Sequence, residues 1–98
     1  MQRMAWILKI KPGKEEAYRA AHAEVWPELI QASIDAGFRN HSVFVQGRII
    51  IAYLEADDVE AADARLAGQD VLIRWNEAMS HLLEETETPP FEEVFHFD

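Results

Sequence analysis

Three side chains suited to contacting a ligand, Tyr18, His22 and Trp26, recur at intervals of four residues in the segment AYRAAHAEVWPELI. Residues four apart lie on one face of an α-helix, so this spacing stacks a phenol, an imidazole and an indole along a single stripe. Apolar residues extend the same stripe, which predicts that it faces the protein interior. A histidine in that position has either a structural role or a chemical one.

The imidazole of His22 can exchange a proton near neutral pH, because an unperturbed histidine titrates at about 6.5. In a structural role it would be a core histidine whose ring is satisfied by a backbone carbonyl. Its aromatic neighbours favour a site for a small neutral sugar, since aromatic faces cover the C–H surface of a sugar while the imidazole donates or accepts a proton. Trp75, in a later helical segment, is expected either to add a second wall to this site or to belong to the core.

The remaining residue types narrow the chemistry to acid–base catalysis without a covalent step. The chain has no cysteine, which excludes a thiolate nucleophile, a disulfide and a thiolate metal site. The serines lack the glycine context of a nucleophile elbow. No two of the four histidines have the spacing of a helical metal-binding pair, so we expect no metal.

The charge of the chain argues against several partners. A formal charge of −9 with nine scattered Lys and Arg residues repels polyanions, so nucleic acid is not expected to bind. No glycine-rich loop or arginine cluster is present to offset the charge of a phosphorylated substrate. The apolar runs are too short for a membrane span or a signal peptide, which predicts a cytoplasmic protein without a membrane partner.

Alternating and helical patterns divide the chain into elements of one expected domain, residues 1–98. Period-two alternation predicts strands over 3–11, 41–45, 49–56 and 91–97. Helical periodicity and capping residues predict helices over 14–36, 57–66 and 70–85. Pro27 lies inside the first helical segment and should kink or break it just beyond His22.

The resulting order, with the second helical region interrupted, is β-α-β-β-α-β. This is the ferredoxin-like arrangement of the α+β class, a four-stranded antiparallel sheet with helices on one face. The other face of such a sheet stays uncovered. In a chain of this length a second copy is the usual cover for an apolar sheet face, so we expect a homodimer packed sheet to sheet.

The chain resembles the L-rhamnose mutarotases essentially from end to end. The similarity is carried by WILKIKPGKEEAYRAAHAEVWPEL, RNHSVFV, DVLIRWNEAM and the closing EVFHFD. Its most specific part is the pattern YxxxHxxxWPEL at Tyr18, His22 and residues 26–29. Because members of that family are dimeric α/β barrels of ferredoxin-like protomers, the resemblance implies the same fold here.

The resemblance also implies an isomerase that interconverts the α and β anomers of a 6-deoxy-L-hexose, with L-rhamnose first, and that requires no cofactor. Ring opening needs a proton on the ring oxygen while the anomeric hydroxyl loses one, and one well-placed acid–base group is worth roughly 10² to 10⁴ in rate. By this resemblance His22 is the proton donor and Tyr18 contacts the sugar. Trp26 and Trp75 are expected to complete the aromatic part of the substrate site.

Two positions depart from the family pattern. Asn40-His41 stands where an aromatic commonly follows Asn, and Trp75-Asn76 stands where the late helix can have a Trp pair. A hydrogen-bonding group replaces a stacking surface at both places, so His41 and Asn76 are expected to contact the sugar. Such groups discriminate hydroxyl orientation, which makes L-fucose or another aldose a rival substrate. His41 is also offered as a second titrating group beside His22.

Two functions of other classes stay open on the sequence alone. Dimeric α/β barrels also include small monooxygenases, for which an apolar pocket would be expected. A non-catalytic sugar-binding protein would contact the sugar without accelerating anomer exchange.

Overall fold

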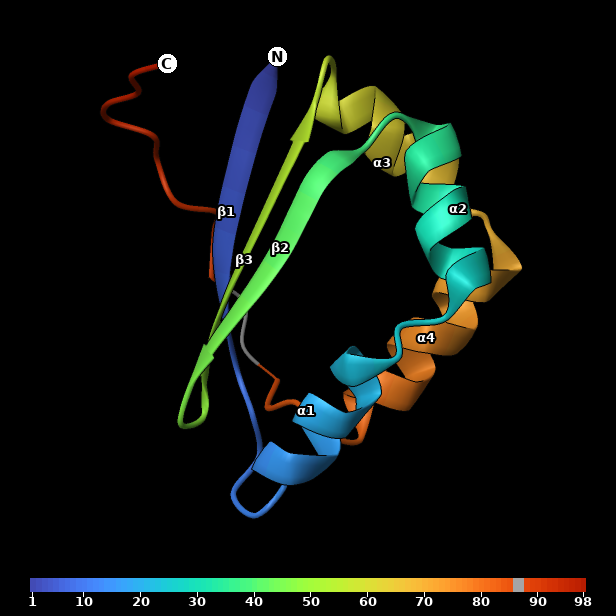
Figure 1. Cartoon of the computed structure of the whole chain (residues 1–98), viewed down its shortest axis with the longest axis vertical. Coiled ribbons are helices and arrows are strands. Elements are labelled where there is room, and N and C mark those ends of the chain that lie inside the picture. Colours follow the sequence, from blue (N-terminus) through green and yellow to red (C-terminus); the bar gives the residue numbers. More distant parts are fainter. Residues whose placement is uncertain (86–87) are drawn as a thin grey trace.

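A computed structural model describes residues 1–85 and 88–98, and within them a sheet is covered by helices on one face (Figure 1). The strands β1 (Gln2–Lys9), β2 (Arg39–Gln46) and β3 (Ile49–Ala56) form an antiparallel sheet in the order β1-β3-β2. The helices are α1 (Glu15–Ala23), α2 (Pro27–Ala36), α3 (Val59–Ala67) and α4 (Asp70–Ser80). This arrangement confirms the predicted ferredoxin-like α+β class.

The first helical segment is divided into α1 and α2, as the position of Pro27 predicts. Trp26 adopts φ −56° and ψ 125°, outside the helical region, and Pro27 is the first residue of α2. Proline suits this position because the first helical N–H groups have no partner within the helix. At the other end of α2, Gly37 adopts φ 116° and its N–H bonds to the last turn, which directs the chain into β2.

The last helix is shorter than the predicted 70–85, since α4 ends at Ser80. Beyond it the backbone pairs with the end of β1: the N–H of Lys11 donates to the carbonyl of Leu82 at 2.8 Å, and the N–H of Glu84 donates to that of Lys9 at 2.9 Å. This pairing uses the Leu82 carbonyl and the Glu84 N–H, which would form hydrogen bonds within α4 if the helix were longer. Among the described residues, no helix is long and apolar enough to cross a membrane.

The strand predicted over 91–97 is wrong for the described chain, in which the sheet has three strands. The N–H of Phe91 donates to the carbonyl of Ala5 in β1 at 2.8 Å, but the segment then leaves β1 (Figure 1). Alternating apolar residues form a strand only where a neighbouring edge and a covered face are available. Here Phe95 and Phe97 stay exposed.

The two faces of the sheet differ sharply. Toward the helices, β3 buries alternate residues in the core, Ile50, Ala52, Leu54 and Ala56, as the two-residue period of a strand requires. The opposite face, called the outer face below, includes Ile7, Phe44, Ile51 and Tyr53. Phe44 is 61% exposed there, so this face lacks the cover that the helices give the other one.

Candidate active site

The predicted pair on α1 is brought together directly. The rings of Tyr18 and His22 stack with their centroids 4.1 Å apart and their planes at 28°. The imidazole Nδ1 lies 2.9 Å from the carbonyl oxygen of Tyr18, and since that oxygen can only accept, Nδ1 carries the hydrogen. The nitrogen left for proton exchange with a ligand is therefore Nε2 of His22.

Tyr18 lies beneath this histidine. It is 3% exposed and packs with Ile10, Ile50 and Met79. Burial raises the pKa of the Tyr18 phenol to about 12, because the charged phenolate is poorly solvated there. At neutral pH Tyr18 is thus an uncharged support for the imidazole that can hydrogen-bond but does not act as a base.

Two tryptophans continue the aromatic surface from His22. Trp75, on α4, meets His22 edge to face at 5.3 Å and 77°. Trp26, in the break between α1 and α2, meets Trp75 at 5.2 Å and 86°. Trp26 is therefore connected to His22 through Trp75, and not by one continuous helix. Edge-to-face contacts of this kind are favourable aromatic geometry. They place the two indoles, called the wall below, on one side of the imidazole.

His41 approaches the same region from the sheet. Its ring lies 6.2 Å from that of Trp6 on β1, which shares the helix-facing side of the sheet with Ala52. Partial burial and the positive charge of His22 lower the pKa of His41. Both causes favour the neutral form of His41 at neutral pH.

A β-bulge precedes His41 and was not predicted from the sequence. The pairing of β2 with β3 shifts register between Arg39 and Ser42, and Asn40 within that interval has φ 52°. Asparagine tolerates this left-handed conformation better than most residues. Bulges re-aim neighbouring side chains, and this one lies at the point of β2 where His41 faces Trp6. Trp6 was also missed, although it alternates with Met4 and Leu8 on β1.

Asn76 is the site candidate that the structure does not bring into this group. It is exposed on α4, and one helical step of about 100° directs it to a different side of the helix from Trp75. Its role in sugar binding stays a prediction. Among the described residues, no cluster of three or more His, Asp or Glu side chains could hold a metal ion.

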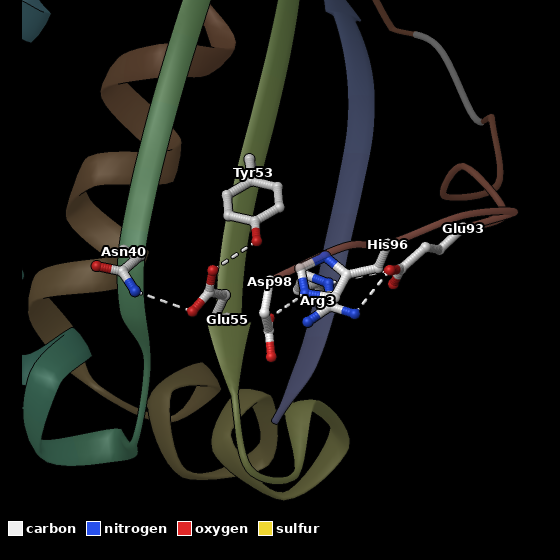
Figure 2. Close-up of polar contacts among 7 residues, drawn as sticks. All are labelled: Arg3, Asn40, Tyr53, Glu55, Glu93, His96 and Asp98. Carbon is white, nitrogen blue, oxygen red and sulfur yellow. Dashed lines mark hydrogen bonds and ion pairs between the residues drawn. The ribbon is translucent and has the colours of Figure 1, made fainter.

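A second polar group, formed by Asn40, Tyr53 and Glu55, lies on the outer face of the sheet (Figure 2). Glu55 accepts hydrogen bonds from the hydroxyl of Tyr53 at 2.5 Å and from Nδ2 of Asn40 at 2.9 Å. These bonds, with that of Tyr53 first, lower the pKa of the Glu55 carboxyl. Glu55 thus links the bulge before His41 to the outer face of β3.

The C-terminal segment is tied to the same end of the sheet. Arg3 donates from Nε and Nη2 to one carboxylate oxygen of Glu93, at 3.0 and 2.7 Å. His96 lies 2.6 Å from Asp98, and that hydrogen bond lowers the pKa of Asp98. The contact between Arg3 and Glu93 ties the segment to β1, and His96 and Asp98 lie close to Arg3 (Figure 2).

Comparison with known sequences identifies the family that this sequence matches. The family model of L-rhamnose mutarotase matches residues 3–97. The L-rhamnose mutarotase of Lactiplantibacillus plantarum is 32% identical, with 100% of each chain covered. That of Acidiphilium cryptum is 31% identical, with 98% of each chain covered.

Solved structures agree with this match. The crystal structure of L-rhamnose mutarotase from Formosa agariphila superposes with a TM-score of 0.84 at 25% identity and 100% coverage of both chains. A dimeric ferredoxin-like protein from an uncultured marine organism shares the fold, with a TM-score of 0.67 at 17% identity and coverage of 98% and 96%. Sequence and structure agree over nearly the whole chain, and this protein belongs to the L-rhamnose mutarotase family.

Proposed function

We propose that this protein interconverts the α and β anomers of L-rhamnose by acid–base catalysis, with His22 as the proton donor. Family membership supports the isomerase class. The observation that carries the assignment to His22 is its half-buried ring, held between Tyr18 and Trp75, with Nδ1 bonded to a carbonyl and Nε2 available. An oriented imidazole beside aromatic surface suits a neutral sugar.

The reaction needs one proton delivered and one removed. In the proposed step, Nε2–H of protonated His22 donates to the ring oxygen as the bond between that oxygen and the anomeric carbon breaks. The anomeric hydroxyl loses its proton at the same time and becomes the carbonyl of the open chain. Rotation about the adjacent carbon–carbon bond and closure on the other carbonyl face return both protons, so no atoms are gained or lost.

His41 is proposed as the group that accepts the proton of the anomeric hydroxyl. Its lowered pKa keeps the imidazole neutral, which is the form that accepts a proton. The charge of His22 is the second cause of that shift, after burial, so His41 is less readily protonated when His22 is charged. A donor and an acceptor with different proton affinities are what the reaction needs.

Trp26, Trp75 and Tyr18 are proposed as substrate contacts of different kinds. The half-buried indoles can cover the C–H face of the sugar, whereas the buried Tyr18 reaches it through its hydroxyl only. Asn76 and His41 are proposed to read hydroxyl orientation, which keeps L-fucose as a rival substrate. The lack of cysteine favours our placement of this reaction in the cytoplasm.

We also propose that the protein acts as a homodimer joined through its outer faces. Phe44 and Ile49 are 61% and 45% exposed on the uncovered side of the sheet. Apolar surface of this kind usually marks an interface. The dimeric ferredoxin-like neighbour supports the same assembly.

The test of the function is anomeric exchange NMR with purified protein. Exchange between the two anomeric signals of L-rhamnose should accelerate in proportion to protein concentration, and L-fucose should be compared under the same conditions. Binding detected by saturation transfer without accelerated exchange would instead identify a non-catalytic sugar-binding protein. The double variant His41→Tyr with Asn76→Trp should change the ratio of the two exchange rates, and an unchanged ratio would remove both residues from sugar recognition.

A further inference from the structure

We propose that Arg74 is a positioning residue of this site, which holds the indole of Trp26 in place and so sets the wall next to Trp75. Its kinetic consequence rests on the proposed mutarotase function. The placement of Trp26 by Arg74 is independent of that function and can be measured separately.

Trp26 needs such support because it lies in the break between two helices. Glu24, which follows the end of α1, has φ −135° and ψ 67°, outside the helical region. The carbonyl of Trp26 accepts hydrogen bonds from Leu29 and Ile30 at 3.0 and 3.2 Å, so its backbone is tied to α2. Those bonds do not fix the side-chain torsions, and the direction of the indole depends on what it touches.

The indole of Trp26 meets two side chains of α4. Trp75 meets it edge to face at 5.2 Å, and the guanidinium carbon of Arg74 lies 5.7 Å from its ring centroid. A guanidinium within about 6 Å of an indole face is attracted by the ring electrons. Arg74 and Trp75 are consecutive on α4, so one segment of that helix holds Trp26 from two directions.

Two carboxylates orient the guanidinium over the ring. Nε of Arg74 donates to Asp70, one turn earlier on α4, at 2.8 Å. A terminal nitrogen lies 3.6 Å from the carboxylate of Glu28, in the first turn of α2. A planar guanidinium can keep these contacts while it covers an aromatic face, which a lysine ammonium cannot reproduce. Arg74 thereby connects α4 to α2 across the indole.

The same contacts argue against a role in stability alone. The side chains of Arg74, Glu28 and Asp70 are 51%, 78% and 82% exposed. Ion pairs with this exposure contribute little to folding. The half-buried partner in the group is Trp26, which reaches His22 through Trp75. The geometry therefore assigns Arg74 an effect on substrate binding that exceeds its effect on stability.

The first test compares Arg74→Met with a matched variant, Arg19→Met, which removes a guanidinium from the exposed side of α1. For anomer exchange of L-rhamnose, Arg74→Met should raise KM about twofold to fivefold, the range set by one exposed cation–aromatic contact. The value of kcat should stay within about twofold, since His22 and His41 keep their places. Arg74→Lys should raise KM less than Arg74→Met does.

Three results would contradict the proposal. An unchanged KM in Arg74→Met would remove Arg74 from the site. An equal rise in Arg19→Met would show a general effect of net charge. A fall in kcat with an unchanged KM would place the effect on proton transfer and not on the wall.

The second test does not depend on activity. Protein labelled with 5-fluorotryptophan should give one fluorine signal for each of Trp6, Trp26 and Trp75, assigned with the three Trp→Phe variants. In Arg74→Met the Trp26 signal should shift while the Trp6 signal stays in place, and an unshifted Trp26 signal would refute the positioning role. If the parent protein failed to accelerate exchange, the proposed function would fall, and this measurement would still decide the role of Arg74.

Discussion

The surroundings of His22 are compatible with both roles that the sequence left open, the structural one and the proposed chemical one. Its Nδ1 is satisfied by the backbone carbonyl of Tyr18, as in a core histidine. Its ring is only half-buried and touches Trp75, as a site residue would. The carbonyl bond and the proposed chemistry are compatible because they use different ring nitrogens.

Replacing His22 separates these roles. His22→Ala should reduce the catalysed anomer exchange by about 10² to 10⁴, the usual value of one acid–base group. Melting temperature should fall little, because the removed ring is only partly buried. Exchange NMR and thermal unfolding monitored by circular dichroism measure the two effects.

The matched control is His81→Ala, which removes an exposed imidazole at the end of α4. It should leave both measurements unchanged. A large loss of melting temperature with His22→Ala would support the structural role, and full activity in that variant would contradict the catalytic one.

His41 makes the stability of the fold depend on pH. Burial and the charge of His22 hold its pKa below the ordinary 6.5, so the unfolded chain takes up the proton before the folded one as pH falls. The stability that His41 contributes is therefore present above about pH 6.5 and is lost as pH falls through its folded pKa. Between pH 7.5 and pH 5, the parent should lose more unfolding free energy than His41→Asn.

Urea unfolding at both pH values measures this difference. His81→Asn should lose as much stability over the interval as the parent does. Equal losses in the parent and His41→Asn would show that the pKa of His41 does not differ between the folded and unfolded states.

At the scale of elements, the end of α2 imposes a backbone conformation that favours glycine. Gly37 has φ 116°, and a Cβ there would also approach the Arg65 side chain to 3.1 Å. Gly37→Ala should lower the free energy of unfolding by about 1 to 3 kcal/mol, the usual strain of such a position. Chemical denaturation gives the value.

Gly68 provides the comparison within the same chain. It has φ −85° and a Cβ would meet no atom within 4 Å. Gly68→Ala should be neutral or slightly stabilising, because alanine loses less chain entropy on folding. Equal effects of both substitutions would contradict the argument from backbone conformation.

The sequence predicted those features that depend on neighbours along the chain. The four-residue spacing of Tyr18 and His22 produced a stacked pair, and Pro27 broke the helix where expected. Contacts between distant segments were missed: the Trp6 ring beside His41 depends on strand register and on the bulge at Asn40. Local periodicity predicts which residues share a face of a strand, but not the bulge or the residues that meet across the sheet.

The same limit explains the errors at the C-terminal end. The alternation over 91–97 is that of a strand, but whether a strand forms depends on an available edge and cover. The early end of α4 depends on pairing between residues 82–84 and the end of β1. Both outcomes are decided by tertiary contacts that override local propensity.

For the whole molecule, the outer face predicts how the assembly can be broken. Phe44→Glu places a charge on the open side of β2 and should convert the proposed dimer to a monomer, because an unpaired charge is costly to bury in an interface. Sedimentation at micromolar concentration measures the mass. A parent protein that sediments as a monomer would refute the dimer itself.

A helix-side substitution tests which surface is used. Ile73 is 53% exposed on α4, so Ile73→Glu places a similar charge on the opposite layer. It should leave the proposed dimer intact. A dimer that survives Phe44→Glu and dissociates with Ile73→Glu would place the interface on the helices.

The strand β2 contributes side chains to both faces of the sheet. His41 lies beside Trp6 on the helix-facing side, and Phe44, three residues later, lies on the outer face. The proposed proton donor is different, because Tyr18 and His22 stack within a single turn of α1. Dilution should therefore affect the two halves of the site unequally. As the proposed dimers dissociate, KM should rise through the loss of order around His41, while each molecule keeps an intact donor, so that the affinity of the enzyme for its sugar becomes a function of how much of the protein is present.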